Sequence, residues 1–187
     1  MSSASNHSSK TGWSALDLAH IALFAVLIAV CSWIAVPSAV PFTLQTFAVF
    51  LAVGLLGGKR GTVSVLVYLL LGAVGIPVFA GFGAGIGVLL GPTGGYLLGF
   101  LISALTYWLI TASFGKKLPT RICAMVLGLL VCYAFGTFWF MAVYARTSGP
   151  ISLVTALSWC VFPFLLPDCA KLALAAVLSG RLARYLR

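Results

Sequence analysis

The stretch "ALDLAHIALFAVLIAVCSWIAV", residues 15–36, decides the class of the protein. It contains one acidic residue, Asp17, and no Lys or Arg, and it is long enough to cross a bilayer, which takes about 20 apolar residues. It is also longer than the core of a signal peptide, and no clear small-residue cleavage site follows it. We therefore interpret it as a membrane span that is kept in the protein.

The rest of the chain has the same character, with 62% hydrophobic and 7% charged residues, against roughly 25% charged residues in a soluble domain. Gly, Pro and charged residues divide it into further apolar runs. The expected spans are residues 15–36, 43–57, 61–76, 95–114, 122–144 and 167–186. We expect an all-α integral membrane protein of six transmembrane helices, with a polar tail at 1–14 and one membrane domain at 15–187.

The basic residues predict the orientation of these spans. One side of the membrane receives Lys10, Lys59, Arg60, Lys116, Lys117, Arg121, Arg181, Arg184 and Arg187, and the loops of the other side receive only Arg146. By the positive-inside rule both termini are cytoplasmic, in a cell-membrane protein. The same positions account for the net charge of +9, so the charge predicts topology and not nucleic-acid binding.

Few residues are available for catalysis or metal binding. Five cysteines lie in apolar surroundings without metal-ligand spacing and are expected to be reduced packing residues: Cys31, Cys123, Cys132, Cys160 and Cys169. His7 and His20 are interpreted as incidental. The chain contains no G-x-x-x-x-G-K-[ST] phosphate loop, no histidine cluster and no serine or cysteine beside a base. We expect binding or transport, without a metal or cofactor, and not an enzyme.

One pair of charges stands inside an apolar run, "LLPDCAKLALAAVL", residues 165–178. A charge within a span costs on the order of 3 kcal/mol and marks a candidate functional site. Asp168 and Lys171 are three positions apart and share one face of a helix. Pro167 is expected in the first turn of that helix, with Asp168 near the positive end of its dipole. The pair either forms a wall with an acceptor and a donor for a neutral ligand, or neutralises itself near the outer interface.

Two further polar features fall on the same outer side. The glycine-rich stretch "VFAGFGAGIGVLLGPTGGY", residues 78–96, includes Thr93 and Tyr96 and offers backbone N–H groups to an anion; the alternative is a flexible lid or close helix packing. The stretch "VPFTLQTF", residues 40–47, presents Thr43, Gln45 and Thr46. Capping is favoured for Thr43 and a pocket for Gln45. Together with the charged pair, these stretches predict an outward-facing binding pocket.

The block "VPFTLQTFAVFLAVGLLGGKRGTVSVLVYLLLGAVGIPVFAGFGAGIGVLLGPTGGYLLGF", residues 40–100, and the later "PFLLPDCAKLALAA", residues 163–176, resemble the BioY family, the biotin-specific substrate-binding (S) components of energy-coupling-factor (ECF) transporters. The resemblance covers about residues 15–187. It implies six helices with an outer biotin pocket. It also implies assembly with a transmembrane T component and two cytoplasmic ATPase subunits, which would explain the missing phosphate loop.

The resemblance also implies roles for single residues. Asp168 would accept hydrogen bonds from the ureido N–H groups of biotin, and Lys171 would donate one to the ureido carbonyl. Aromatic and apolar walls would hold the rings and the valeryl chain, and the carboxylate would reach the loop "GFGAGIG", which offers only backbone groups. The implied ligand-binding residues are Thr43, Gln45, Phe79, Phe82, Gly83, Gly85, Thr93, Tyr96, Leu166, Asp168 and Lys171.

Small residues on the first span form a face that another helix can approach closely: Ala15, Ala19, Ala22, Ala25 and Ala29. The resemblance implies that this face docks the T component, and packing within the six-helix domain is the alternative. Three other functions remain open. They are capture of a different small vitamin, a structural role in a larger membrane complex, and a membrane-embedded enzyme.

Overall fold

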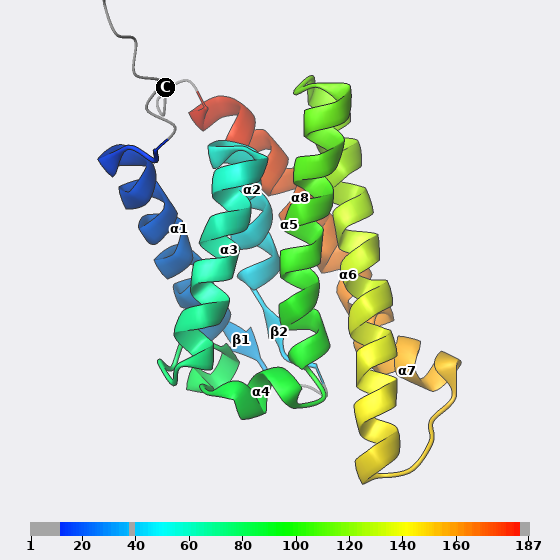
Figure 1. The fold of residues 1–187 in the computed structure, drawn as a ribbon. Helices are drawn as coiled ribbons and strands as arrows, with labels where there is room; N and C mark the ends of the chain where they lie inside the picture. Colours follow the sequence, from blue (N-terminus) through cyan, green and yellow to red (C-terminus); the bar gives the residue numbers. More distant parts are fainter. Residues whose placement is uncertain (1–11, 38–39, 184–187) are drawn as a thin grey trace, which may run out of the picture.

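The computed structural model describes residues 12–37 and 40–183, and most of them are helical. Figure 1 shows a bundle of longer helices with short elements gathered at one end. The longer helices are α1 (Ala15–Trp33), α2 (Gln45–Leu56), α3 (Gly58–Ala73), α5 (Gly94–Phe114), α6 (Leu118–Thr147) and α8 (Phe162–Leu182). The short elements are η1 (Ala80–Phe82), α4 (Ile86–Leu90), α7 (Leu153–Cys160) and the strands β1 (Ala35–Val36) and β2 (Phe42–Thr43), which pair antiparallel.

Four helices are long and apolar enough to cross a membrane: α1, α5, α6 and α8. Large apolar side chains cover their outer surfaces, among them Leu23, Leu109 and Phe138. A soluble protein rarely exposes so much contiguous apolar surface, so the bundle is built to contact lipid. The chain is therefore a helical membrane protein, and the crossing of the bilayer by α2 and α3 as well stays a prediction.

Helix α2 occupies the interior of the bundle. It has 12 residues and spans about 18 Å at 1.5 Å per residue, well short of a hydrocarbon core of about 30 Å. Most of its length is buried, including Ala48, Val49, Ala52 and Val53. The run at 43–57 is therefore apolar because protein surrounds it. Helix α2 also forms one wall of the space between the helices.

Glycines allow α5 and α6 to pack closely. A side chain at Gly95 would collide with Trp139, and one at Gly136 would collide with Tyr96. Close approach through small residues is the usual way in which membrane helices associate, because lipid provides no hydrophobic drive between them. These contacts fix the faces that α5 and α6 turn toward the interior.

The start of the last helix differs from the prediction. Helix α8 begins at Phe162 with Pro163 in its first turn, and Pro167 lies inside it. A proline inside a helix removes one backbone hydrogen bond, and here the loss falls close to the start, where few such bonds have yet formed. Asp168 therefore stands beyond the first turn, and the expected stabilisation by the helix dipole does not apply, because that effect is confined to the first turn.

The connection before α8 also differs. Helix α6 continues to Thr147, and the segment expected to be an irregular outer loop contains α7. At the opposite end of the bundle, the junctions of α2 with α3 and of α5 with α6 lie beside the end of α8 (Figure 1). Most of the described Lys and Arg residues belong to that end. His7, Lys10, Arg184 and Arg187 fall outside the described residues.

Candidate functional site

A cavity of about 120 Å³ lies between α2, α5, α6 and α8, near the end of the bundle that carries the short elements. One enclosed water needs roughly 10–15 Å³ by the same measure, so the cavity has room for a small organic molecule. It is lined by Val40, Pro41, Thr43, Gln45, Thr46, Phe79, Ala80, Val88, Thr93, Tyr96, Leu97, Phe100, Leu129, Cys132, Tyr133, Cys160, Phe164, Asp168 and Lys171.

The charged pair forms one wall of this cavity. Lys171 Nζ lies 2.9 Å from Asp168 Oδ1 and donates a second hydrogen bond, of 2.6 Å, to the backbone carbonyl of Thr43. The ammonium also sits 3.8 Å from the centre of the Phe42 ring, a cation–π contact. Only 4% of Asp168 and 8% of Lys171 is exposed. The two charges thus neutralise each other and at the same time face the cavity.

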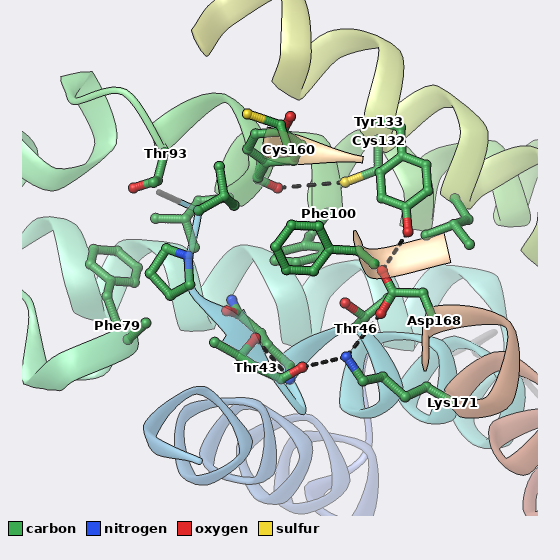
Figure 2. A pocket seen from close by; sticks show the side chains of 18 of the residues that line it. Thr43, Thr46, Phe79, Thr93, Phe100, Cys132, Tyr133, Cys160, Asp168 and Lys171 are labelled. Atoms are coloured by element: carbon green, nitrogen blue, oxygen red, sulfur yellow. Dashed lines mark hydrogen bonds and ion pairs between the residues drawn. The ribbon is translucent and has the colours of Figure 1, made fainter. Parts of the chain in front are cut away.

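Tyr133 completes the surroundings of the carboxylate. Its hydroxyl donates a hydrogen bond of 2.6 Å to Asp168 Oδ2, so both carboxylate oxygens are bound (Figure 2). Each oxygen can accept about two hydrogen bonds, and an ammonium has three N–H donors. Asp168 therefore retains acceptor capacity on both oxygens, and Lys171 retains one donor beyond its bonds to Asp168 and Thr43. This wall can receive a molecule that carries N–H donors beside a carbonyl.

The start of α2 forms a second polar wall. Gln45 is buried and donates a hydrogen bond of 2.9 Å from Nε2 to the hydroxyl of Tyr68. The hydroxyl of Thr43 accepts a hydrogen bond of 3.2 Å from the backbone N–H of Gln45. The N-cap residue of α2 is Leu44 and the helix has no side-chain cap, so this bond is a local turn and not the helix cap expected for Thr43. Both residues also line the cavity. These two hydrogen bonds hold Thr43 and Gln45 in place at the wall of the cavity.

The glycine-rich segment covers the far side of the cavity from the charged pair. Phe79 and Thr93 lie there in Figure 2. The Phe79 ring packs edge-on against Tyr68, with ring centres 5.6 Å apart, and it fills the space beside Gly72, where any side chain would collide with it. Tyr96 reaches across to Thr137, with 2.9 Å between the hydroxyl oxygens. This side is mostly aromatic, with a few hydroxyl groups.

The structure brings most of the sequence-predicted site residues together. Those that line the cavity are Thr43, Gln45, Phe79, Thr93, Tyr96, Asp168 and Lys171. Four predicted residues lie elsewhere. Phe82 is 64% exposed and stacks on Trp33, and Leu166 is 83% exposed because it stands two positions before Asp168 and so faces nearly the opposite way. Gly83 and Gly85 fold the loop through backbone bonds to Phe79 and Gly72.

The alanines of α1 divide into two groups. Ala25 and Ala29 are buried in the bundle, which is the alternative that the sequence left open for this face. Ala15, Ala19 and Ala22 are exposed. A face of small residues therefore remains on the outer surface of α1 toward its N-terminal end.

Several lining residues were not singled out in the sequence, above all Tyr133, Phe164 and Phe100. The sequence contained one indication of a role for Tyr133: a tyrosine in the middle of a long apolar run needs a hydrogen-bond partner for its hydroxyl. Cys160 also lies at the cavity, and burial raises the pKa of its thiol. Among the described residues no group of three or more His, Cys, Asp or Glu could hold a metal ion.

Comparisons with known proteins agree on one family. The model of the BioY family matches residues 4–187. The biotin transporter BioY of Thermotoga maritima is 42% identical over 87% of this chain and 92% of its own, and the probable biotin transporter BioY of Pyrococcus horikoshii is 41% identical over 90% and 96%. The crystal structure of an S-component for biotin from an ECF-type ABC transporter superposes with a TM-score of 0.79 at 28% identity, over 90% of both chains.

Proposed function

Because the chain belongs to the BioY family, we propose that it captures biotin outside the cell as the substrate-binding component of an ECF-type transporter in the cytoplasmic membrane. Its relatives are biotin transporters, and a solved biotin S-component has the same fold. The observation that carries the proposal is the buried Asp168–Lys171 pair at the wall of a cavity of suitable size.

The chemistry of the cavity suits the two ends of biotin. The ureido ring has two N–H groups that flank a carbonyl, which match the spare acceptor positions of Asp168 and the spare donor of Lys171. The fused rings would lie against Phe100 and Phe164, and the valeryl chain would extend toward Phe79 and Thr93. Among the described lining residues Lys171 alone carries a positive charge, so the biotin carboxylate would be met by hydroxyl and backbone groups.

The proposed arrangement in the membrane follows from charge. Six helices cross or enter the bilayer, both termini are cytoplasmic, and the cavity with its short covering elements faces outward. Arg146 lies at the outer end, and the clustered cations at the α2–α3 and α5–α6 junctions face the cytoplasm. In this orientation the protein binds its ligand from outside the cell before any ATP is hydrolysed.

Delivery into the cell requires partners. We propose a transmembrane T component, which docks on the exposed alanines Ala15, Ala19 and Ala22 of α1, and two cytoplasmic ATPase subunits. The chain is then a transport component and not an enzyme, as its transporter relatives indicate. ATP hydrolysis falls to the partners, since the chain contains no phosphate loop. Biotin is the cargo, and no cofactor is proposed.

Calorimetric titration of biotin into the purified, detergent-solubilised full-length protein tests the proposal. A single saturable site for biotin supports it. A site that ignores biotin and takes another small vitamin would keep the transport class and change the cargo. A protein whose thermal unfolding no vitamin alters would point to a structural subunit.

A further inference from the structure

A second cavity lies at the end of the bundle away from the Asp168–Lys171 pair. Its volume is about 560 Å³, and it is lined by Gly12, Trp13, Asp17, Leu56, Gly57, Gly58, Lys59, Arg60, Trp108, Thr111, Ala112 and Lys116. A neighbouring cavity of about 290 Å³ shares six of these residues and adds Arg121. The mechanism proposed for biotin capture uses none of this space.

Among the described residues that line this cavity, the basic side chains Lys59, Arg60 and Lys116 outnumber the single acidic one, Asp17. The whole chain has two acidic residues: Asp168 belongs to the other cavity, and Asp17 Oδ1 pairs with Arg60 at 2.9 Å. Lys59 lies over the ring of Trp13, 4.9 Å from its centre. Neither Lys59 nor Lys116 forms an ion pair with any residue in the described part of the chain. Two ammonium groups therefore face one cavity without a carboxylate partner.

The backbone adds to this positive potential. Lys59 and Arg60 stand in the first turn of α3, where the helix dipole already presents its positive end and where cations are disfavoured. The N-cap residue is Gly57, so no side chain caps the helix. A bound anion would relieve the repulsion among these groups, and an anion at a helix N-terminus gains both hydrogen bonds and favourable electrostatics.

The remaining lining identifies the kind of anion. Trp13, Trp108 and Leu56 make part of the wall apolar, and indole rings gather at the level of lipid headgroups in membranes. Basic pockets between membrane helices on the cytoplasmic side bind the headgroups of acidic lipids. We propose that this cavity holds the phosphodiester group of an anionic phospholipid, with Lys59 and Lys116 as its ammonium partners and the indoles against its glycerol and upper acyl region.

The test uses the full-length protein in a neutral detergent. Short-chain phosphatidylglycerol, phosphatidylcholine and inorganic phosphate are titrated separately, and the midpoint of thermal unfolding and the lipid retained in native mass spectrometry are recorded. Phosphatidylglycerol is expected to raise the midpoint and to be retained, whereas phosphatidylcholine is not. Lys59→Gln and Lys116→Gln should each weaken the affinity for phosphatidylglycerol about fivefold, and the double variant more.

Lys117→Gln is the matched control, because it removes the same charge one position from Lys116 but does not line either cavity. It should retain the affinity of the unchanged protein. Equal losses in all three single variants would reduce the effect to bulk charge and overturn the site. Equal binding of phosphatidylglycerol and phosphatidylcholine would also overturn it. If inorganic phosphate bound as tightly as phosphatidylglycerol, the cavity would be a site for free phosphate, and the proposal of a lipid ligand would be overturned. Unchanged unfolding midpoints without lipid show that the variants are folded.

Discussion

The hydroxyl of Tyr133 and the carboxylate of Asp168 are joined by a hydrogen bond of 2.6 Å, on the carboxylate oxygen that Lys171 does not bind. Two different helices, α6 and α8, therefore hold the carboxylate in place before any ligand arrives. A group that is already ordered loses little entropy on binding, which favours tight capture of a small molecule. The first two predictions follow from this arrangement.

Asp168→Asn and Lys171→Met should each weaken biotin binding by at least tenfold in calorimetric titrations. A hydrogen bond to a charged group contributes roughly 1.5–3 kcal/mol, and each variant would remove at least one of the contacts proposed for the ureido ring. Asp17→Asn is the control, since it changes the other acidic residue of the chain, which does not line the cavity of Asp168 and Lys171. Biotin affinities equal to that of the unchanged protein, in folded variants, would assign the pair a purely structural role.

Tyr133→Phe should weaken biotin binding by a smaller factor, about fivefold to tenfold, because the carboxylate keeps its bond to Lys171 and loses only one neutral donor. The phenyl ring keeps the packing, but the buried carboxylate loses one hydrogen bond, so the unfolding midpoint should fall by a few degrees. Tyr144→Phe makes the same change on the same helix outside the cavity lining. If both variants bind biotin as well as the unchanged protein does, Tyr133 does not orient Asp168 for the ligand.

Gly72→Ala should lower both stability and biotin affinity. The new methyl group would occupy the position of the Phe79 ring, and this ring is buried and lines the cavity. Overpacking of this kind typically costs about 1–3 kcal/mol. Gly180→Ala is the matched control, since it is also helical and has nothing within 4 Å of the added atom. Thermal unfolding and biotin titration are measured for both variants. If only Gly72→Ala loses stability and affinity, the cause is the contact with Phe79; equal losses in both variants would mean that replacing any helical glycine has this effect.

Arg121→Gln should lower the unfolding midpoint while leaving biotin affinity nearly unchanged. The guanidinium donates to the carbonyl of Gly54 and to the hydroxyl of Ser179, both at 2.8 Å, and to Tyr107 at 3.3 Å. It thereby ties α6 to three other helices. Loss of about 2 kcal/mol would shift the midpoint by on the order of 5 °C.

Arg146→Gln is the control for this charge change, because Arg146 is exposed at the other end of the bundle. An equal shift of the midpoint in both variants would mean that net charge, and not the three contacts of Arg121, determines the effect on stability. A large loss of biotin affinity in Arg121→Gln would contradict the separation of the two ends of the bundle.

The sequence predicted the features that depend only on the length of an apolar run or on the spacing of two residues in a helix. Residues 15–33 and 95–114 could only be long apolar helices, and three positions on a helix necessarily place Lys171 beside Asp168. The expected first span was too long at its end, because α1 stops at Trp33 and residues 35–36 form β1. The interior position of α2 was not predictable from hydropathy, because burial in protein and burial in lipid select the same apolar residues. Biotin was predicted from the resemblance to the BioY family, which the family match and the relatives confirm. The residue patterns alone do not distinguish biotin from another small vitamin.

The start of α8 shows how one boundary changes a site. The expected start at residue 167 left residues 163–166 outside the helix, so the faces of these residues could not be assigned. With the helix beginning at Phe162, Phe164 stands four positions before Asp168 and shares its face, while Leu166 points away. Tyr133 was missed for a different reason: one hydroxyl within a long apolar run barely changes its hydropathy.

The hydrogen bond from Lys171 to the carbonyl of Thr43 joins residues 128 positions apart. Synthesis proceeds from the N-terminus, so the lysine enters the membrane only when nearly the whole chain has left the ribosome. Until then β2 and the start of α2 lack their ammonium partner, and the polar wall of the cavity does not exist. Competence to bind biotin is thus acquired in the last step of biogenesis, and a chain interrupted before α8 is a membrane protein without a receptor site.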